Sequence, residues 1–385
     1  MNACKTPERP ATLSKAAAAA CQGRTVMLLA ALALAMAPPL SSAQSNVTVF
    51  GTLDAGIEYR SNMPKPPAVQ VSSALVYSNA LGIRGSEDLG SGMKAMFRLE
   101  AGFAPDTGMS LQGGRLFGRQ SWVGLGDDNN KIVLGRMYTP LYDVIGYLDP
   151  LQGANTSLWA MDGGMVSRVD KALRYTRSDG AFHVNAQYSF GSDTVGATIN
   201  GAAGGAARSR ESTFAVDYTT AKLMMALVYD NLHGPMTAAQ YGTGLYVPSL
   251  LPPAPLTPQR AERAVAALRS TWGDTSLFAG YRRLRTTVQE TRHDSNLFWT
   301  GLTQRFGPSW TATVGAYHQQ VVGIDARPSL LVLQAQYRFS KQTGLYTNVS
   351  KVWNTRLSNM GVDLQTQTQL GAAQLGVNAG MFYFF

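Results

Sequence analysis

Residues Ala80–Phe103 read ALGIRGSEDLGSGMKAMFRLEAGF, and this stretch decides the fold class. Over residues 94–103, apolar side chains at every second position alternate with a set that is mostly charged. Successive side chains of a β-strand point to opposite faces, so this segment predicts a strand with one apolar and one charged face. A soluble sheet would bury the apolar face in a core. A membrane barrel would place that face in lipid and turn the charges toward a water-filled lumen. The apolar set is Ala95, Phe97, Leu99, Ala101 and Phe103, and the other set is Lys94, Met96, Arg98 and Glu100.

The composition agrees better with the membrane barrel. The chain has 385 residues, of which 45% are hydrophobic and only 15% are charged. Soluble proteins usually carry about 25% charged residues. We expect no transmembrane helix in the mature chain, because no window of about 18 apolar residues is present.

The N-terminus predicts a secretory signal peptide over residues 1–43. A basic region precedes an apolar core of 12 residues, Val26 to Ala37, and small residues at 41–43 give a cleavage point before Gln44. Cleavage would remove both cysteines, Cys4 and Cys21, and lower the net charge from +9 to +6, because four basic residues and one acid leave with the signal. An exported chain without disulfides needs another source of stability, such as a closed sheet. We expect residues 44–385 to form a single barrel domain.

The mature chain predicts about sixteen strands, with no linker between them. Short turns and longer connections alternate along the whole chain. An up-and-down barrel places every second connection at the same end, and short periplasmic turns with long external loops are typical of bacterial outer-membrane barrels. A soluble sandwich has no reason to sort its loops in this way. The expected strands are 46–60, 73–86, 92–103, 115–126, 130–138, 168–178, 181–190, 211–219, 222–231, 261–273, 274–286, 292–306, 309–322, 327–340, 342–353 and 372–385.

Two regions depart from a plain alternating pattern. Strand 292–306 is partly apolar on both faces, which indicates either a subunit contact or an error of register. The chain ends in an aromatic strand, and Met381, Tyr383 and Phe385 share one face of it. Such an end fits a last strand that closes against the first, with its rings at the membrane interface.

The sequence resembles the trimeric general porins of Gram-negative outer membranes, of the betaproteobacterial type. The similarity is specific over the first 150 residues and only general over residues 190–325. The motifs that carry it are Val47–Gly56 (VTVFGTLDAG), Leu81–Gly90 (LGIRGSEDLG), Gly118–Leu125 (GRQSWVGL), Leu134–Arg136 (LGR) and Phe339–Tyr346 (FSKQTGLY).

The resemblance implies a sixteen-stranded, homotrimeric barrel whose third external loop, Thr139–Ser167, folds into the lumen. It places Asp149 where such porins often carry an acid that faces a ladder of wall arginines. It also implies that Met381, Tyr383 and Phe385 form the C-terminal signal read by the barrel assembly machinery. The sequence departs from the family at Ala80, where many relatives have an arginine, and in an unusually aromatic ending.

Face assignment predicts a basic lumen wall. A lipid-facing arginine near the membrane midplane costs about 2–4 kcal/mol, which favours an inward position. Rings of Arg or Lys favour anions in pores, so with Asp143 and Asp149 on the inner loop we expect a transverse field and a weak to moderate anion preference. Arg119 fits the face pattern less cleanly, since it shares parity with Val123 and Leu125. The expected pore-lining residues are Arg84, Lys94, Arg98, Arg119, Arg136, Arg168, Arg174 and Arg338.

The function expected from these patterns is an outer-membrane diffusion channel for small hydrophilic solutes and ions, surrounded by outer-membrane lipid. The alternative is a barrel that acts as a surface structure, an adhesin or an enzyme. No H-E-x-x-H, G-x-S-x-G or Walker motif occurs, so we expect no catalytic, metal or cofactor site. The basic residues are spread along the chain rather than clustered, which argues against nucleic acid.

Overall fold

The computed structural model describes residues 46–63, 69–165, 168–192, 209–233, 259–288, 291–364 and 366–385. The expected signal peptide lies outside these residues. None of the helices among them has the length and apolar character that a bilayer span requires.

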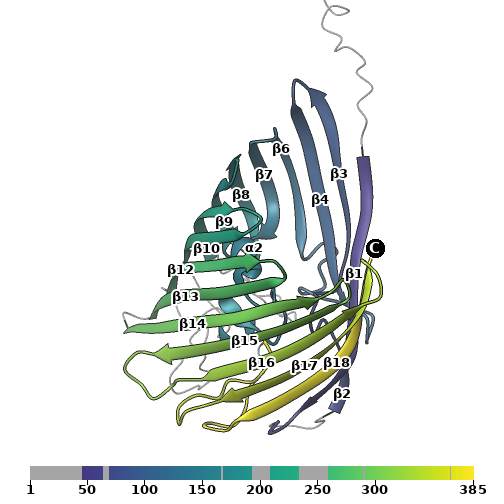
Figure 1. The fold of residues 1–385 in the computed structure, drawn as a ribbon. Helices are drawn as coiled ribbons and strands as arrows, with labels where there is room; N and C mark the ends of the chain where they lie inside the picture. The colour runs from purple at the N-terminus through teal and green to yellow at the C-terminus, as the bar shows by residue number, and fades with distance from the viewer. Residues whose placement is uncertain are drawn as a thin grey trace, which may run out of the picture. The chain divides into compact units, whose positions relative to one another are not determined.

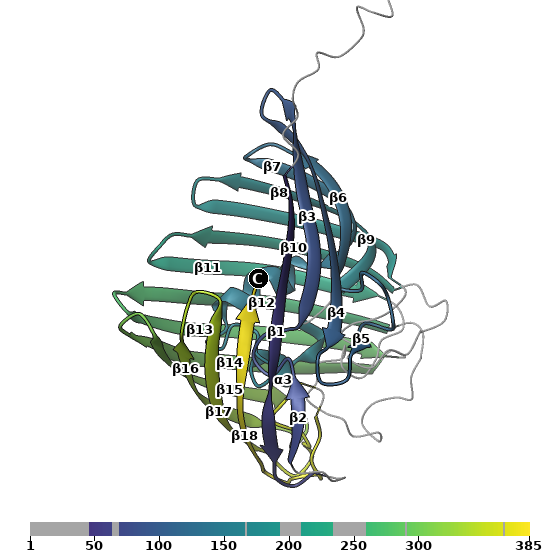
Figure 2. The same cartoon turned by 90° about the vertical axis from the view of Figure 1, so that its right-hand side faces the viewer.

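The described residues form one closed antiparallel sheet, seen from two sides in Figures 1 and 2. Apart from β2 and β5, each strand pairs with its neighbours in sequence. β1 pairs with β18 from Thr52 opposite Phe384 to Arg60 opposite Gly376, which closes the sheet. The strands are β1 (Asn46–Arg60), β2 (Val69–Ser73), β3 (Ala80–Gly90), β4 (Met93–Ala104), β5 (Met109–Ser110), β6 (Gln120–Gly126), β7 (Asn130–Tyr138), β8 (Arg168–Asp179), β9 (Phe182–Ser192), β10 (Ser209–Thr219), β11 (Leu223–His233), β12 (Gln259–Trp272), β13 (Thr275–Val288), β14 (Thr291–Phe306), β15 (Trp310–Val321), β16 (Ser329–Arg338), β17 (Thr343–Trp353) and β18 (Gln374–Phe384).

These segments make a barrel of sixteen strands, as the sequence predicts. β2 and β3 both pair with β1, one on each half of it, and therefore occupy one position in the barrel. The two-residue β5 pairs only with Phe103 and Ala104 at the end of β4, so it is not counted as a separate strand of the barrel. The chain between β2 and β3 leaves the wall because the Asp54 carboxylate accepts hydrogen bonds from the backbone N–H groups of residues 75, 76 and 77, at 3.1, 3.1 and 2.7 Å. The expected strand 73–86 is therefore wrong at its start.

Tight turns join the strands at one end of the barrel. The Asp127 carboxylate caps one of them by accepting the backbone N–H groups of Asn129 and Asn130, at 2.8 and 2.6 Å. Gly180 and Gly273 have φ of +58° and +56°, a conformation that glycine adopts without strain, and this allows two-residue turns. The longer connections that the structure describes, such as 139–165 and 322–328, start and end at the opposite strand ends, as the predicted sorting of loops requires.

Apolar side chains form the outer face of the sheet. Val123 and Leu125 on β6 are 59% and 52% exposed, and Val47 and Val49 on β1 are both 59% exposed. A soluble protein rarely exposes such continuous apolar surface, whereas a bilayer covers it. The buried core lies inside the barrel instead, against the segment between β7 and β8.

That segment contains two short α-helices, each followed by a 3₁₀ turn. They are α2 (Pro140–Ile145), η1 (Gly146–Leu148), α3 (Leu158–Met161) and η2 (Gly163–Met165). Thr139 caps α2 by accepting the Tyr142 N–H at 3.4 Å, and Pro140 occupies the first turn, where no N–H is needed. We call residues 139–165 the inner loop.

Candidate pore constriction

The inner loop packs onto an apolar stretch of the lumen wall. Its side chains Leu141, Ile145, Leu148 and Leu158 are all 0% exposed and belong to one cluster with inward residues of the wall. Those wall residues lie on β10–β12 and β14–β18 and include Ala215, Met224, Val228, Val265, Leu297, Trp299, Tyr317, Leu330, Val332, Tyr346 and Val352. Burial on this scale stabilises the loop by about 1.5–3 kcal/mol for each large side chain.

β14 contacts the inner loop through Trp299 and Gly301. The Trp299 indole N–H donates to the Leu148 carbonyl at 3.0 Å, and Pro150 approaches so near to Gly301 that a Cβ there would lie 2.3 Å from the proline ring. Phe298, next to Trp299, points outward and is 48% exposed. β14 is therefore apolar on both faces because lipid covers one face and the inner loop covers the other. This explains the untidy pattern of strand 292–306 without an error of register.

A buried ionic group holds the far end of the inner loop. Asp162 accepts from Arg263 at 3.1 Å and pairs with Arg282 at 2.9 Å, and all three side chains are at most 1% exposed. Neither arginine was among the expected pore residues, although each lies between outward-facing neighbours on its strand. Removal of one partner from such a group leaves an uncompensated buried charge.

Asp149 lies differently from the expectation. It is 0% exposed, its Oδ1 accepts from the Tyr317 hydroxyl at 2.6 Å, and its Oδ2 accepts from the Gly153 N–H at 3.0 Å. Burial raises the pKa of the Asp149 carboxyl, and the hydrogen bond from Tyr317 partly offsets the rise. Asp149 therefore anchors the loop to β15 and does not face wall arginines across an opening. The resemblance predicts an acid at this position, but it does not indicate the tyrosine opposite it.

The opposite wall, built from β1, β3 and β4, carries arginines that point inward. Arg84 on β3 and Arg98 on β4 are register partners, and their guanidinium carbons lie 5.3 and 4.8 Å from the centroid of the Phe50 ring. Arg98 also donates to Glu100 at 2.6 Å. Arg84 is exposed to the lumen. Ala80, where relatives often carry an arginine, is buried at the start of β3.

Arg119 and Arg168 lie above an aromatic stack that reaches into the inner loop. The Arg168 guanidinium lies 4.3 Å from the Tyr138 ring centroid and Arg119 lies 5.6 Å from it. Tyr138 stacks on Tyr142 at 4.1 Å, and Tyr142 stacks on Trp159 at 5.4 Å. Arg119 points inward and pairs with Glu100, although alternation along β6 would place it on the outer face. It can do so because it precedes the first residue of β6, so the alternation of that strand does not set its direction.

Two further expected arginines face the lumen at other levels. Arg174 on β8 pairs with Asp143 of the inner loop at 2.7 Å and also donates to the Tyr138 carbonyl. Arg338, at the turn end of β16, lies 5.3 Å from the Phe382 ring centroid, and its guanidinium is 3.5 Å from the Tyr77 hydroxyl.

Lys94 and Arg136 lie away from these groups. Lys94 pairs with Asp128 of a turn at 2.8 Å and therefore lies at the rim. Arg136 follows an irregularity in the β7–β8 register and is 8% exposed. It donates to the Gly118 carbonyl at 2.7 Å and shares Asp170 with Arg115. The irregularity places the Arg136 side chain where it forms an ion pair with Asp170 in the wall.

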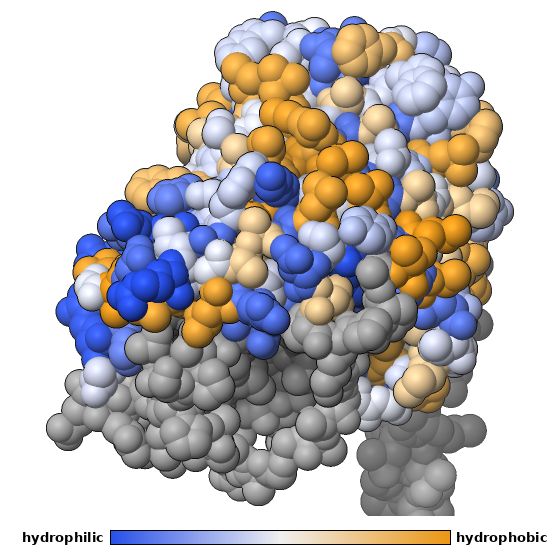
Figure 3. Space-filling model, turned by 90° about the horizontal axis from the view of Figure 1, so that it is seen from below, coloured by the Kyte–Doolittle hydropathy of each residue, from blue (hydrophilic) through white to orange (hydrophobic). Residues whose placement is uncertain are grey.

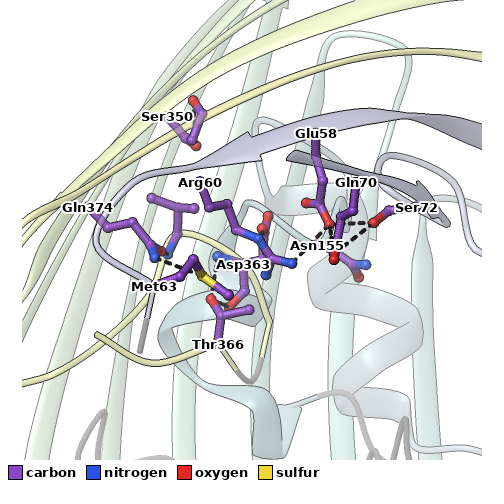
Figure 4. Close-up of polar contacts among 12 residues, drawn as sticks. Glu58, Arg60, Met63, Gln70, Ser72, Asn155, Ser350, Asp363, Thr366 and Gln374 are labelled. Carbon is purple, nitrogen blue, oxygen red and sulfur yellow. Dashed lines mark hydrogen bonds and ion pairs between the residues drawn. The ribbon is translucent and has the colours of Figure 1, made fainter. Parts of the chain in front are cut away.

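A cavity of about 1060 Å³ remains between the inner loop and the side of the barrel that contains β1 and β2. Arg119, Arg168, Tyr142 and Trp159 lie on it, and its other lining includes an acid–base cluster toward the loop end. Figure 4 shows that cluster. Its central residue is Glu58, which accepts from Arg60 at 2.9 Å, from Gln70 at 2.6 Å and from Ser72.

Asp363, from the segment between β17 and β18, completes this cluster. It lies 3.6 Å from Arg60. Burial, together with the nearby Glu58 carboxylate, raises the pKa of Asp363 to about 7. Its charge therefore changes near neutral pH, inside the cavity.

Among the described residues, the histidines give weak support for catalysis. His183 and Asp217 share the lumen face and lie 2.8 Å apart, but the hydroxyl beside them, Thr219, donates to Asp217 and not to the imidazole. His318 contacts Ser329 at 2.8 Å on the outer face. A nucleophile must lie within hydrogen-bond reach of its base, which in turn needs an orienting acid, and neither pair meets both conditions.

The C-terminal strand keeps the predicted face. Met381, Tyr383 and Phe385 point outward and are 52%, 39% and 42% exposed. Phe382 points inward, is fully buried and contacts Tyr77, with ring centroids 4.8 Å apart.

Comparisons with known proteins agree with this architecture. Residues 29–357 match the Gram-negative porin family. An outer membrane porin protein of Bordetella pertussis is 32% identical over 55% of this chain and 61% of its own length. The outer membrane porin protein 32 of Delftia acidovorans is 27% identical over 93% of this chain and 99% of its own length.

Solved structures show the same fold. An anion-selective porin from Comamonas acidovorans superposes with a TM-score of 0.73 at 20% identity, over 89% of this chain and 100% of the other. The outer membrane protein OmpT of Vibrio cholerae, in its trimer form, superposes with a TM-score of 0.65 at 16% identity, over 89% of this chain and 99% of the other. With a closed barrel, a lipid-type outer face and an inner loop in the lumen, the chain belongs to the Gram-negative porin family and is an outer-membrane channel.

Proposed function

We propose that the channel passes small hydrophilic solutes and ions, is narrowed by the inner loop, and has a weak to moderate preference for anions. The asymmetry of the lumen supports this. The inner loop is fixed to one wall, and the open cavity borders the other wall, where Arg119 and Arg168 lie. Arginine remains charged at any working pH and attracts anions in a water-filled constriction.

The pore charges in this proposal are Arg84, Arg98, Arg119, Arg168, Arg174 and Arg338, with Lys94 and Arg136 in supporting positions at the rim and in the wall. Asp143 supplies the opposing charge from the inner loop, through its pair with Arg174. Asp149 contributes by fixing the loop. The relative from Comamonas acidovorans is named as anion-selective, which points in the same direction.

The proposal includes assembly and export. Residues 1–43 act as a signal peptide, and residues 44–385 are inserted by the barrel assembly machinery through Met381, Tyr383 and Phe385. Three copies then associate in outer-membrane lipid. Purified protein that migrates as a trimer before heating and as a monomer after it would agree with this, and a monomer under both conditions would contradict it.

Reversal potentials in planar bilayers under a salt gradient test the channel itself. We expect stepwise conductance in threes and a potential of the sign that anion preference requires. Cation preference would overturn the charge assignment. A complete lack of conductance would instead favour the alternative of a surface barrel or an adhesin.

A further inference from the structure

The outer surface of β10–β14 carries charged side chains at the loop end of the barrel. The strand register arranges them in three rows, which run across neighbouring strands. The row nearest the membrane consists of Tyr229, Ala264, Arg283 and Asn296. The next row consists of Asn231, Glu262, Arg285 and Asp294. The outermost row consists of Arg210, His233, Arg260, Thr287 and Arg292. We call Arg210, Arg260, Arg283, Arg285 and Arg292 the outer arginine patch.

The alternation along β13 shows that the patch points away from the lumen. Arg282 and Leu284 are 0% exposed inside the barrel, whereas the side chains of Arg283 and Arg285 between and beyond them are 51% and 40% exposed. In Figure 3, strongly hydrophilic side chains gather at the left-hand edge, on the side where Figure 1 places the left-hand ends of β14 and β15. Solutes in the pore therefore do not meet these arginines.

Aromatic side chains mark the membrane interface just below the patch. Tyr281 and Phe298 pack together on the outer face with ring centroids 5.0 Å apart, one row closer to the membrane than Arg283. The Tyr281 hydroxyl donates to Asn296 at 2.8 Å and the Tyr229 hydroxyl donates to Glu262 at 2.7 Å, so both rings direct their polar ends toward the loops. Rings with this orientation sit at the level of the lipid headgroups.

The patch carries more positive than negative charge. Arg283, Arg285 and Arg292 all approach the single carboxylate of Asp294, the first two at 3.1 and 3.8 Å. Arg260 pairs with Glu262 at 2.9 Å. Five arginines thus share two acids in these rows, and exposed pairs of this kind hold their partners only weakly.

The other side of the barrel has no equivalent at the same level among its described residues. On β1 and β2 the outward side chains remain apolar to the strand ends: Ile57, Tyr59, Val69 and Val71 are 60%, 39%, 58% and 64% exposed. A rim that merely needed to be soluble would be polar all round. On β17 the outward face carries a single lysine at this end, Lys351, which lies over Trp353. The exposed loop arginines Arg327 and Arg356 both lie beside Asp325. Among the described strands, rows of outward arginines therefore occur on β10–β14.

We propose that the outer arginine patch binds the phosphate groups of phosphorylated glycolipids in the outer leaflet of the outer membrane. The guanidinium fork matches phosphate oxygens in a bidentate geometry. Successive rows are about 7 Å apart along a strand, or about 5 Å in height once strand tilt is included. An ordinary phospholipid headgroup layer is about 5–8 Å thick and reaches only the first row or two. A phosphorylated saccharide headgroup is deep enough to reach all three. This goes beyond solute transport and does not depend on the selectivity of the pore.

Lipid retention tests the proposal. The full-length mature protein is titrated in mixed micelles with a bisphosphorylated lipid A, and bound lipid is counted by native mass spectrometry. We expect saturable binding that weakens as salt rises. The variant Arg283→Gln/Arg285→Gln/Arg292→Gln should bind at least about tenfold less tightly, while its conductance and reversal potential stay at wild-type values. The matched control, Arg177→Gln/Arg305→Gln, removes exposed arginines at the turn end and should bind as the wild type does.

Three results would overturn the proposal: wild-type affinity in the triple variant, equal affinity for the dephosphorylated lipid, or complete displacement of the lipid by millimolar inorganic phosphate. The last result would mean that the patch recognises free phosphate rather than a headgroup. Loss of conductance in the wild type would refute the proposed pore function but leave this lipid assay unaffected, so the two failures can be told apart.

Discussion

Both sides of the lumen carry inward-facing arginines, but these arginines have different roles on the two sides. The wall from β10 to β18 is apolar where it meets the inner loop. Its buried arginines, Arg263 and Arg282, both pair with Asp162, and Arg263 also lies 3.8 Å from Asp230. The wall from β1 to β8 leaves Arg84 exposed and places Arg119 and Arg168 beside the cavity. Inward arginines therefore hold the loop on one side and border the cavity on the other. Arg119 and Arg168 are 9% and 8% exposed, so the two roles differ in what lies beside the arginine, the carboxylate of the inner loop or the cavity.

The largest expected effect is the loss of the ionic anchor. Asp162→Ala removes the carboxylate that the buried Arg263 and Arg282 share, while Asp230 remains 3.8 Å from Arg263. Breaking such a buried group costs about 3–5 kcal/mol. We expect a large loss of the compact form that resists heat in detergent electrophoresis. Asp143→Ala is the matched control in the same loop, because the Asp143 side chain is 42% exposed and a pair of that kind contributes about 0.2–1 kcal/mol. Equal losses in the two variants would show that burial of the Asp162 group does not strengthen the anchor.

The next largest effect is expected from the apolar contact between β14 and the inner loop. Trp299→Ala removes the packing of the indole and its bond to the Leu148 carbonyl, a change that costs about 3 kcal/mol for a buried tryptophan. We expect a higher and noisier single-channel conductance as the inner loop loosens. Phe298→Ala, one residue away on the lipid face, should leave conductance unchanged. If Phe298→Ala behaved like Trp299→Ala, β14 would not be the support of the loop.

The charged wall should respond in selectivity rather than in stability. One unit charge about 7 Å from a permeating ion stabilises an anion and destabilises a cation by about 0.6 kcal/mol each in water, roughly a sevenfold change in the preference between them. Arg84→Gln should therefore lower the anion-to-cation permeability ratio by about this factor, with an unchanged heat-modification midpoint. Arg177→Gln, which removes an exposed charge on the outer face at the turn end, serves as the control. An unchanged ratio in Arg84→Gln would remove that residue from the conduction path.

The smallest effect concerns pH. Asp363 has a pKa raised to about 7, so it is neutral below that pH and charged above it. The negative charge gained as pH rises from 6 to 8 should weaken anion preference. The raised pKa also means that this carboxyl favours the docked segment at low pH and that its contribution is lost as pH rises through 7. Asp363→Asn should flatten the dependence of the reversal potential on pH, and a full dependence in that variant would assign it to another group.

The sequence was sufficient for the barrel because the relevant signals are local. Alternation identifies the faces of each strand, and turn residues mark the connections, so most strand ends agree within two residues. The start of β3 was missed because the acceptor that pulls residues 75–77 inward is Asp54, on another strand. A distant partner leaves no trace in the local pattern.

The site was harder to predict for the same reason. Parity predicts a lumen-facing position for Arg84, Arg98, Arg174 and Arg338, and the contacts of these side chains lie on that face. It could not separate a lining arginine from one held in a structural pair, as Arg136 is by Asp170. Nor could it show that Asp149 meets Tyr317, since the two are far apart in the chain.

The central claim is that the inner loop, fixed to the apolar wall, narrows the channel against the charged wall. Deletion of residues 146–157, between the two short helices, tests it in planar bilayers by single-channel conductance and reversal potential. We expect a higher conductance and a lower anion preference, because ions then pass farther from Arg119 and Arg168. Wild-type conductance in the deletion variant would contradict it.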